Sequence, residues 1–84
     1  MRLDLFLKKS LLFKQRSLAQ TACEKNCIRV NYQPAKPAKE IKEGDLIEIQ
    51  LCESYTSLRV LEIPGGNVSK EKARTLYQIL NPPS

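Results

Sequence analysis

The chain has 84 residues, of which 42% are hydrophobic and 27% charged, and its formal net charge is +5. A chain of this length forms one small domain with a thin core, and this composition is typical of a folded protein rather than a disordered one. It leaves no room for a separate catalytic domain, and no apolar run reaches the roughly 20 residues of a membrane span. Asp4 interrupts the first apolar stretch, so we expect a cytoplasmic protein with no secretory signal.

Positive charge is concentrated in the first half of the chain. Residues 1–42 contain ten Lys or Arg side chains and three acidic ones, a balance of +7. Residues 43–84 contain four against six, a balance of −2. Scattered, solvated lysines would not be segregated in this way. The segregation therefore predicts that a polyanion, such as RNA, contacts the first half.

Catalytic and metal-binding chemistry is poorly represented. The chain has no histidine, and its carboxylates are dispersed, so we expect neither an enzyme nor a cofactor. Cys23, Cys27 and Cys52 cannot all pair within one chain, and we expect reduced thiols. A zinc site needs about four ligands. The cysteines are therefore interpreted as small buried side chains, with no metal site.

The first helix is predicted directly after the N-terminus. Leu3, Phe6 and Leu7 repeat at the spacing of one helix face. Lys8 and Lys9 follow at the C-terminal end, where the helix dipole favours cations. Leucine and phenylalanine at positions 11–13 form a short apolar connector to the next element.

The second helix is predicted from about Gln15 to Glu24. Its apolar face consists of Leu18, Ala19, Ala22 and Cys23. Lys14 and Arg16 lie at its beginning, where the dipole disfavours cations, so they are either kept for a partner or tolerated at an exposed end. Asn26 favours the left-handed conformation that ends helices.

Three strands are predicted next, over residues 28–32, 46–51 and 56–63. Alternation in the first strand directs Arg29 outward. The third strand is apolar on both sides, which predicts that another element covers its second face. A final helix capped by Ser69 is the predicted cover. Its apolar stripe is Ala73, Leu76, Tyr77 and Leu80, and residues 81–84 are expected to end it.

Aromatic residues make up 6% of the chain. Tyr32 and Tyr55 carry rings that can stack on unpaired bases, but a tyrosine at a strand end more often packs inside its own protein. The low aromatic content favours recognition of folded RNA through its shape and backbone over a groove for single strands.

Four pieces of the sequence, in this order, resemble the RNA-binding domain named after ribosomal protein S4. They are Arg2-Leu3-Asp4-Leu5-Phe6-Leu7, Lys14-Gln15-Arg16-Ser17-Leu18-Ala19, Ile28-Arg29-Val30-Asn31 and Gly44-Asp45-Leu46-Ile47-Glu48-Ile49. The resemblance covers residues 2 to about 49. It implies an α+β fold of the S4 (αL) type, in which two N-terminal helices pack on a small antiparallel or mixed sheet. A strand and a C-terminal helix over residues 56–80 would complete a single domain of residues 1–84.

The resemblance also implies which residues face RNA. The family's functional positions fall on Arg2, Lys8, Lys9, Lys14, Arg16 and Gln20, and the outward-facing Arg29 completes the candidate set. This prediction requires Arg2, Lys9 and Arg16 to share one exposed face and to stay clear of the protein's own carboxylates.

The chain departs from the family pattern at two turns. Gly usually stands where this chain has Asn26, and Asn-Gly where it has Asn31-Tyr32. Asn is a tolerable replacement for Gly in the left-handed region. Tyr at a turn position with positive φ is strained, so we expect the hairpin to use a different turn.

A lone S4-type chain that closes with Ala73-Arg74-Thr75-Leu76-Tyr77-Gln78-Ile79-Leu80 resembles the RqcP group of bacterial ribosome-associated quality-control factors. That group is related to the ribosome-associated heat-shock protein. The resemblance implies a monomeric, cytoplasmic, ribosome-associated protein. Its expected partners are large-subunit ribosomal RNA and peptidyl-tRNA on stalled, split subunits, and an elongation partner protein that adds alanine tails.

Three other functions remain open at this point. The first is a heat-shock-type factor that recycles blocked large subunits. The second is an RNA-binding module that acts with a separate RNA-modifying enzyme, and the third is a protein-interaction module that uses the acidic second half.

Overall fold

The computed structural model describes residues 1–80. Its elements, in chain order, are α1 (Leu3–Lys9), α2 (Arg16–Glu24), β1 (Ile28–Val30), β2 (Gln33–Pro34), β3 (Leu46–Leu51), β4 (Ser54–Val60), α3 (Lys70–Ala73) and β5 (Tyr77–Ile79). The strands form one sheet in the order β2-β1-β3-β4-β5, and every neighbouring pair is antiparallel. The expected α+β fold is confirmed.

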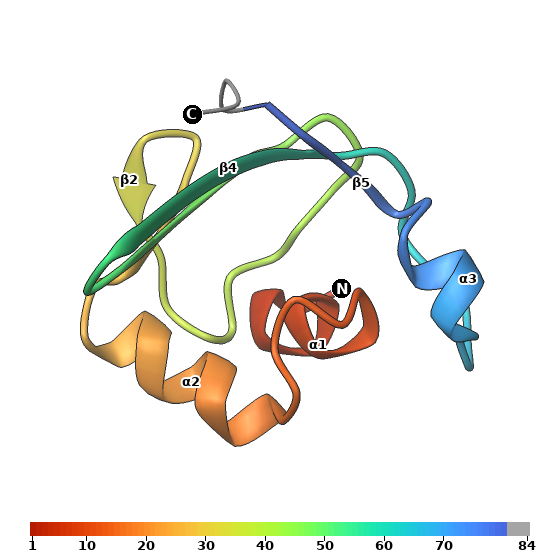
Figure 1. Ribbon diagram of the computed structural model, residues 1–84, viewed down its shortest axis with the longest axis horizontal. Helices are drawn as coiled ribbons and strands as arrows, with labels where there is room; N and C mark the ends of the chain where they lie inside the picture. The colour runs from red at the N-terminus through yellow and green to blue at the C-terminus, as the bar shows by residue number, and fades with distance from the viewer. Residues whose placement is uncertain (81–84) are drawn as a thin grey trace.

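The helices α1 and α2 lie against one face of the curved sheet (Figure 1). We call this the inner face. Every second residue of the strands points toward it and is buried: Ile28, Val30, Ile47, Ile49, Leu58 and Val60. Leu3, Phe6 and Leu7 of α1 are wholly buried in the same core. The opposite, outer face carries the intervening residues, among them Arg29 and Arg59, which are exposed.

Small side chains bring α2 into the core. Ala19, Ala22 and Cys23 are buried, as predicted, but Leu18 is 50% exposed and its assignment to the buried face was wrong. The helix packs through its alanines, which leaves Leu18 at the edge of the contact. Asn26 ends the helix with a φ of 60°, and the Cys27 amide donates to the Ala22 carbonyl at 2.9 Å. The left-handed helix end is therefore confirmed.

The β1–β2 hairpin keeps a tight turn in spite of its tyrosine. Asn31 and Tyr32 have φ values of 52° and 70°, so the expectation of a different turn was wrong. Asn31 fixes this geometry from β3: its amide donates to the Leu46 carbonyl at 2.8 Å, and its side-chain oxygen accepts from the Leu46 amide at 3.0 Å. Because Asn31 is held there and the connection has only two residues, Tyr32 cannot adopt an extended backbone conformation.

The C-terminal segment differs from the prediction. Ser69 caps a helix as expected, since its hydroxyl accepts from the Lys72 amide at 3.1 Å. However, α3 ends at Ala73, and residues 77–79 form β5 on the edge of β4, with Leu58 opposite Ile79. The prediction of a long helix with an apolar stripe was therefore wrong. Without β5 the edge of β4 would be unpaired, and residues 77–79 form backbone hydrogen bonds with it instead of continuing the helix. The expected stop at residues 81–84 lies outside the described part of the chain.

The third predicted strand also needs a correction. β4 covers Ser54–Val60, and Leu61, which follows it, is 47% exposed. Only the inner side of β4 is buried, because β5 extends the sheet at its edge instead of lying over its second face. Leu76, which precedes β5, is wholly buried and closes the core from this end.

Candidate nucleic-acid interface

A single buried carboxylate organises the surface of the two N-terminal helices. Asp4 has no exposed surface. One of its oxygens accepts from Arg2 Nε at 3.2 Å and from the Leu5 amide at 2.8 Å. The other accepts from Arg16 Nε at 3.1 Å, Gln20 Nε2 at 2.9 Å and a second Arg2 nitrogen at 3.3 Å. Three of the predicted RNA-binding residues therefore converge on one anchor.

The Asp4 carboxylate is kept ionised by these contacts. Burial acts to raise the pKa of Asp4, but hydrogen bonds from Gln20, Arg16 and the Leu5 amide outweigh it, so the pKa lies below its ordinary value of 3.8. The helix start is further fixed by loop carbonyls: the Leu3 and Asp4 amides donate to Lys39 and Pro37 at 2.8 and 3.1 Å.

The expectation that the helix arginines stay clear of the protein's own carboxylates was wrong, since Arg2 and Arg16 both bind Asp4. One carboxylate cannot neutralise two guanidinium groups, and the cluster of three keeps a charge of +1. The arginine side chains remain 48% and 42% exposed. Each guanidinium has five N–H donors, so both retain donors for a phosphate while Asp4 fixes their position.

The predicted RNA-binding lysines do not all lie on the same surface. Lys8 follows Asp4 by one helical turn, on the same side of α1. Lys14 is exposed in the connector before α2. Lys9, by contrast, donates to the Gly66 carbonyl at 2.6 Å and ties α1 to the loop before α3. The predicted common face of Arg2, Lys9 and Arg16 therefore holds for the arginines but not for Lys9.

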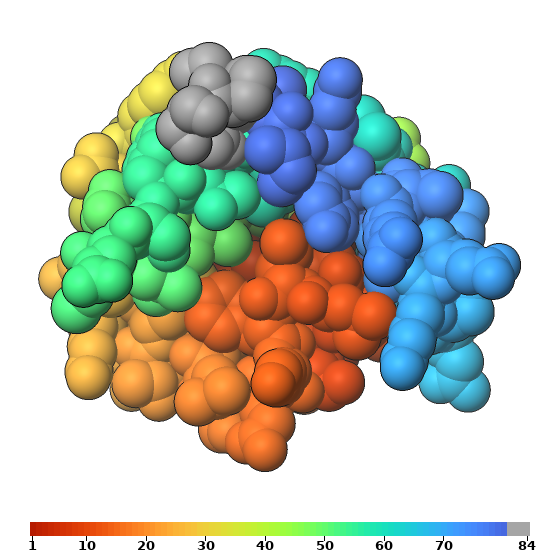
Figure 2. Space-filling model, in the orientation of Figure 1, coloured from red at the N-terminus to blue at the C-terminus, as the bar shows by residue number. Residues whose placement is uncertain are grey.

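We call this surface the helix surface and define it by Arg2, Lys8, Lys14, Arg16 and Gln20. Figure 2 shows the N-terminal residues, red to orange, as one continuous surface, flanked by the β3–β4 hairpin and the C-terminal segment. Arg29 is not part of it. The neighbours of Arg29 in β1 face the helices, so its own side chain projects from the outer face of the sheet.

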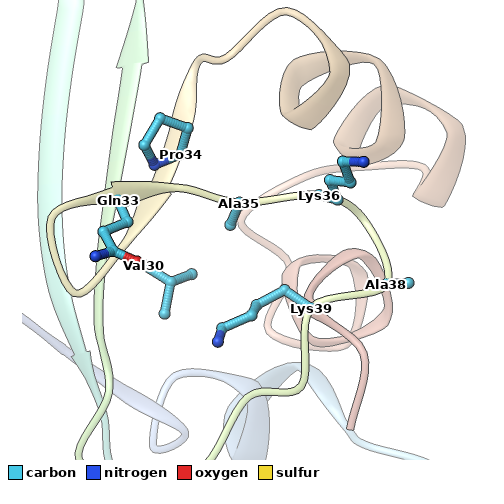
Figure 3. Close-up of a pocket in the computed structure, with 7 residues that line it drawn as sticks. All are labelled: Val30, Gln33, Pro34, Ala35, Lys36, Ala38 and Lys39. Atoms are coloured by element: carbon cyan, nitrogen blue, oxygen red, sulfur yellow. The ribbon is translucent and has the colours of Figure 1, made fainter.

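The loop that follows β2 carries lysines that were not among the predicted site residues. This loop runs beside the start of α1, where the Ile41 amide donates to the Met1 carbonyl at 2.8 Å. Lys36 and Lys39 line a pocket of about 360 Å³ between the loop and the β1–β2 hairpin. In Figure 3, Lys39 extends across this pocket and Lys36 points away from it. In the sequence these lysines recur every third residue, at positions 36, 39 and 42.

The cysteines occupy three different environments. Cys23 is buried, and burial raises its pKa to about 11, so it stays a thiol. Cys27 is half-buried and Cys52 is exposed, so the expectation of small buried side chains holds only for Cys23. Within residues 1–80 no group of three or more Cys, Asp or Glu side chains is placed to hold a metal ion. No helix in this part of the chain is long and apolar enough to cross a membrane.

Known proteins resemble this chain over most of its length. The model of the S4 domain family matches residues 1–47. The chain is similar to the RQC P-site tRNA stabilizing factor of Halalkalibacterium halodurans, with 40% identity over 94% of this chain and 89% of that protein. The protein of the same name from Bacillus subtilis is 35% identical over 95% of this chain and 92% of its own length.

The fold is shared with a solved structure as well. The trimeric structure of Vibrio cholerae heat shock protein 15 is similar to this chain with a TM-score of 0.87 and 28% identity, over 95% of this chain and 81% of that one. The matched S4 segment contains the β1–β2 hairpin and also α1 and α2, the two helices that carry the helix surface. This protein therefore belongs to the S4 domain family and, within it, to the family of the RQC P-site tRNA stabilizing factors.

Proposed function

We propose that this protein is an RNA-binding factor of bacterial ribosome-associated quality control. It binds large-subunit ribosomal RNA and peptidyl-tRNA on stalled, split large subunits, and it holds the tRNA in place while a partner protein extends the nascent chain with alanine. It contributes binding and positioning, with no covalent chemistry of its own. The names of the curated relatives, RQC P-site tRNA stabilizing factors, support this role.

The observation that carries the proposal is the convergence of Arg2, Arg16 and Gln20 on the buried Asp4. A guanidinium that is already held in place loses little conformational freedom when it binds a phosphate. Lys8 and Lys14 add mobile charges beside it. For four to six phosphate contacts, the affinity should fall with salt at a log–log slope of about −3 to −5.

The experiment replaces Arg16 with alanine and measures co-sedimentation with purified large ribosomal subunits. Asp4 keeps its contacts with Arg2, Gln20 and Leu5, so the melting temperature should stay close to that of the unaltered protein. Loss of a charged hydrogen-bond donor should weaken binding about ten- to hundredfold. Arg16→Lys should restore only part of it, since an ammonium group lacks the planar fork.

The matched control is Arg74→Ala. Arg74 is also an exposed arginine, but it lies at the end of α3, far in sequence from the helix surface. It should bind subunits as the unaltered protein does. Equal binding by Arg16→Ala and Arg74→Ala at about 0.15 M salt would reject the proposal.

A second candidate is a factor that recycles blocked subunits, and the structural likeness to heat shock protein 15 favours it. The two functions predict different products in a reconstituted reaction. A quality-control factor should increase alanine addition on stalled large subunits, whereas a recycling factor should release the peptidyl-tRNA without tailing.

A further inference from the structure

The outer face of the sheet carries a row of side chains that the helix surface does not use. Arg29, Glu48 and Ser57 lie opposite one another on β1, β3 and β4. The Tyr55 hydroxyl donates to one oxygen of Glu48 at 2.5 Å. Arg29 is exposed and has no hydrogen-bond or ion-pair partner within residues 1–80. Its charge is therefore available to an external anion.

Tyr32 stands at one end of this row. Its φ is 70° and it is 72% exposed, so it is an aromatic residue in a strained conformation with little packing to stabilise it. Strained residues of this kind concentrate at functional sites. The expectation that a strand-end tyrosine packs inside the protein was wrong here.

Tyr55 stands at the other end and is 44% exposed. Tyr55 lies opposite Gln50, which is on one side of Glu48 along β3. Tyr32 follows Val30 by two residues, and Val30 pairs with Ile47 on the other side of Glu48. The two tyrosines therefore bracket the row of Arg29 and Glu48. The pKa of Tyr55 is raised, first by the Glu48 hydrogen bond, and Tyr32 adds to the shift, which is consistent with two hydroxyls facing the same row.

One hydrogen-bond acceptor in this row has no donor among the described residues. The second oxygen of Glu48 is buried and has no hydrogen-bond donor, although Arg29 lies opposite it in the register. A buried acceptor without a donor is unfavourable, and proteins seldom retain one. Because this oxygen is buried, a ligand can donate to it only if the side chains of the row move.

We propose that the outer face of the sheet binds an unpaired RNA segment, with Tyr32 and Tyr55 stacking on bases and Arg29 contacting the backbone between them. Arg29 and Arg59 place two cations on this face, beside the carboxylate of Glu48, and the Arg59 guanidinium also donates to the Gly44 carbonyl at 2.8 Å. The proposal rests on the proposed function and supplies it with a second RNA-contacting surface, on the side of the sheet that α1 and α2 do not cover.

The composition of this face favours RNA over a protein partner. Stable protein interfaces have an apolar centre, whereas the outer positions of β1, β3 and β4 are Arg29, Glu48, Gln50, Tyr55, Ser57 and Arg59, with a single aliphatic residue, the buried Leu46. Aromatic rings separated by polar and cationic side chains are typical of surfaces that stack bases and follow a backbone. With two phosphates contacted, the log–log salt slope should be only about −1.4 for a single strand.

The experiment measures anisotropy of a fluorescein-labelled oligouridylate of roughly eight nucleotides. Tyr32→Gly removes the ring and suits the left-handed backbone, so the variant should melt no lower than the unaltered protein. It should bind the oligonucleotide about five- to hundredfold more weakly, while Tyr32→Phe should bind like the unaltered protein. The matched control is Leu11→Gly, an exposed residue with a φ of 62° in the connector between α1 and α2.

Two variants separate this proposal from the proposed function. Tyr32→Gly should lose the oligonucleotide and keep large-subunit binding, and Arg16→Ala should do the reverse. Equal oligonucleotide binding by Tyr32→Gly and the unaltered protein would overturn the proposal. So would a Tyr32→Gly variant that changes only the sedimentation of the protein itself or its capture of a protein partner, because the face would then be a protein interface.

Discussion

The protein carries two basic surfaces that are built in opposite ways. On the helix surface, Arg2 and Arg16 are held by hydrogen bonds to a carboxylate that water does not reach. On the outer face of the sheet, Arg29 has no such partner in residues 1–80, and the exposed Tyr32 sits in a strained turn. The first surface has fixed its two arginines before any ligand arrives. The second combines Arg29, which has no partner in residues 1–80, with two exposed tyrosine rings.

This difference has a physical consequence for recognition. Fixed guanidinium groups suit a phosphate backbone of defined shape, as in folded RNA, because little entropy is lost on binding. Rings with a mobile cation suit unpaired bases, which have no fixed geometry and offer a π-face in any sequence. Net charge alone did not distinguish the two surfaces, whereas the hydrogen-bond partners of Arg2, Arg16 and Arg29 did.

The largest effect is expected at the anchor of the helix surface. Asp4→Ala leaves Arg2 and Arg16 as neighbouring cations without their shared carboxylate. We expect the free energy of unfolding to fall by about 2–3 kcal/mol, below the full range for breaking a buried pair because both guanidiniums are partly in water. Urea unfolding measures this loss. Large-subunit binding should fall as well, although a negative charge has been removed.

If charge alone governed the helix surface, Asp4→Ala would bind RNA more tightly than the unaltered protein, since its net charge is higher by one. Tighter binding, measured at a temperature where the variant is folded, would contradict the view that Asp4 positions the arginines.

A smaller effect is expected on acidification. The folded-state pKa of Asp4 lies below its ordinary value of 3.8. The ionised carboxylate therefore stabilises the fold fully at pH values above that ordinary value, and the contribution is lost as the pH falls through the folded-state pKa. Asp4→Asn cannot titrate at this position. Urea unfolding between about pH 5 and pH 2 should show a shallower decline for Asp4→Asn than for the unaltered protein, and parallel declines would rule out a depressed pKa.

The smallest effect concerns the strained turn of the outer face. Tyr32→Gly should raise the free energy of unfolding by about 0.5–1 kcal/mol, since glycine adopts a φ of 70° without steric cost. Thermal denaturation measures the change. Tyr32→Ala should show no such gain, because alanine meets the same steric conflict. A Tyr32→Gly variant less stable than the unaltered protein would mean that the ring packs more than its exposure indicates.

The N-terminal half of the fold was predictable because local patterns and tertiary contacts agree there. The spacing of Leu3, Phe6 and Leu7 defines α1, and Asn26 marks the end of α2 in the left-handed conformation. The C-terminal segment was not predictable in the same way. Residues 73–80 have helical periodicity, but pairing with the free edge of β4 stabilises residues 77–79 as a strand. The local sequence pattern contains no information about a strand edge that is distant in sequence.

The order of the motifs and the excess of cations in the first half were enough to assign the class of the protein and to make Arg2, Arg16 and Gln20 candidate contacts. How these residues act together depends on the tertiary structure. In the sequence Asp4 only interrupts an apolar stretch, and the fold buries it beneath three side chains. Likewise, the sheet separated Arg29 from the helix surface. Charge is a property of residues, but which charges share a surface depends on contacts between segments distant in sequence.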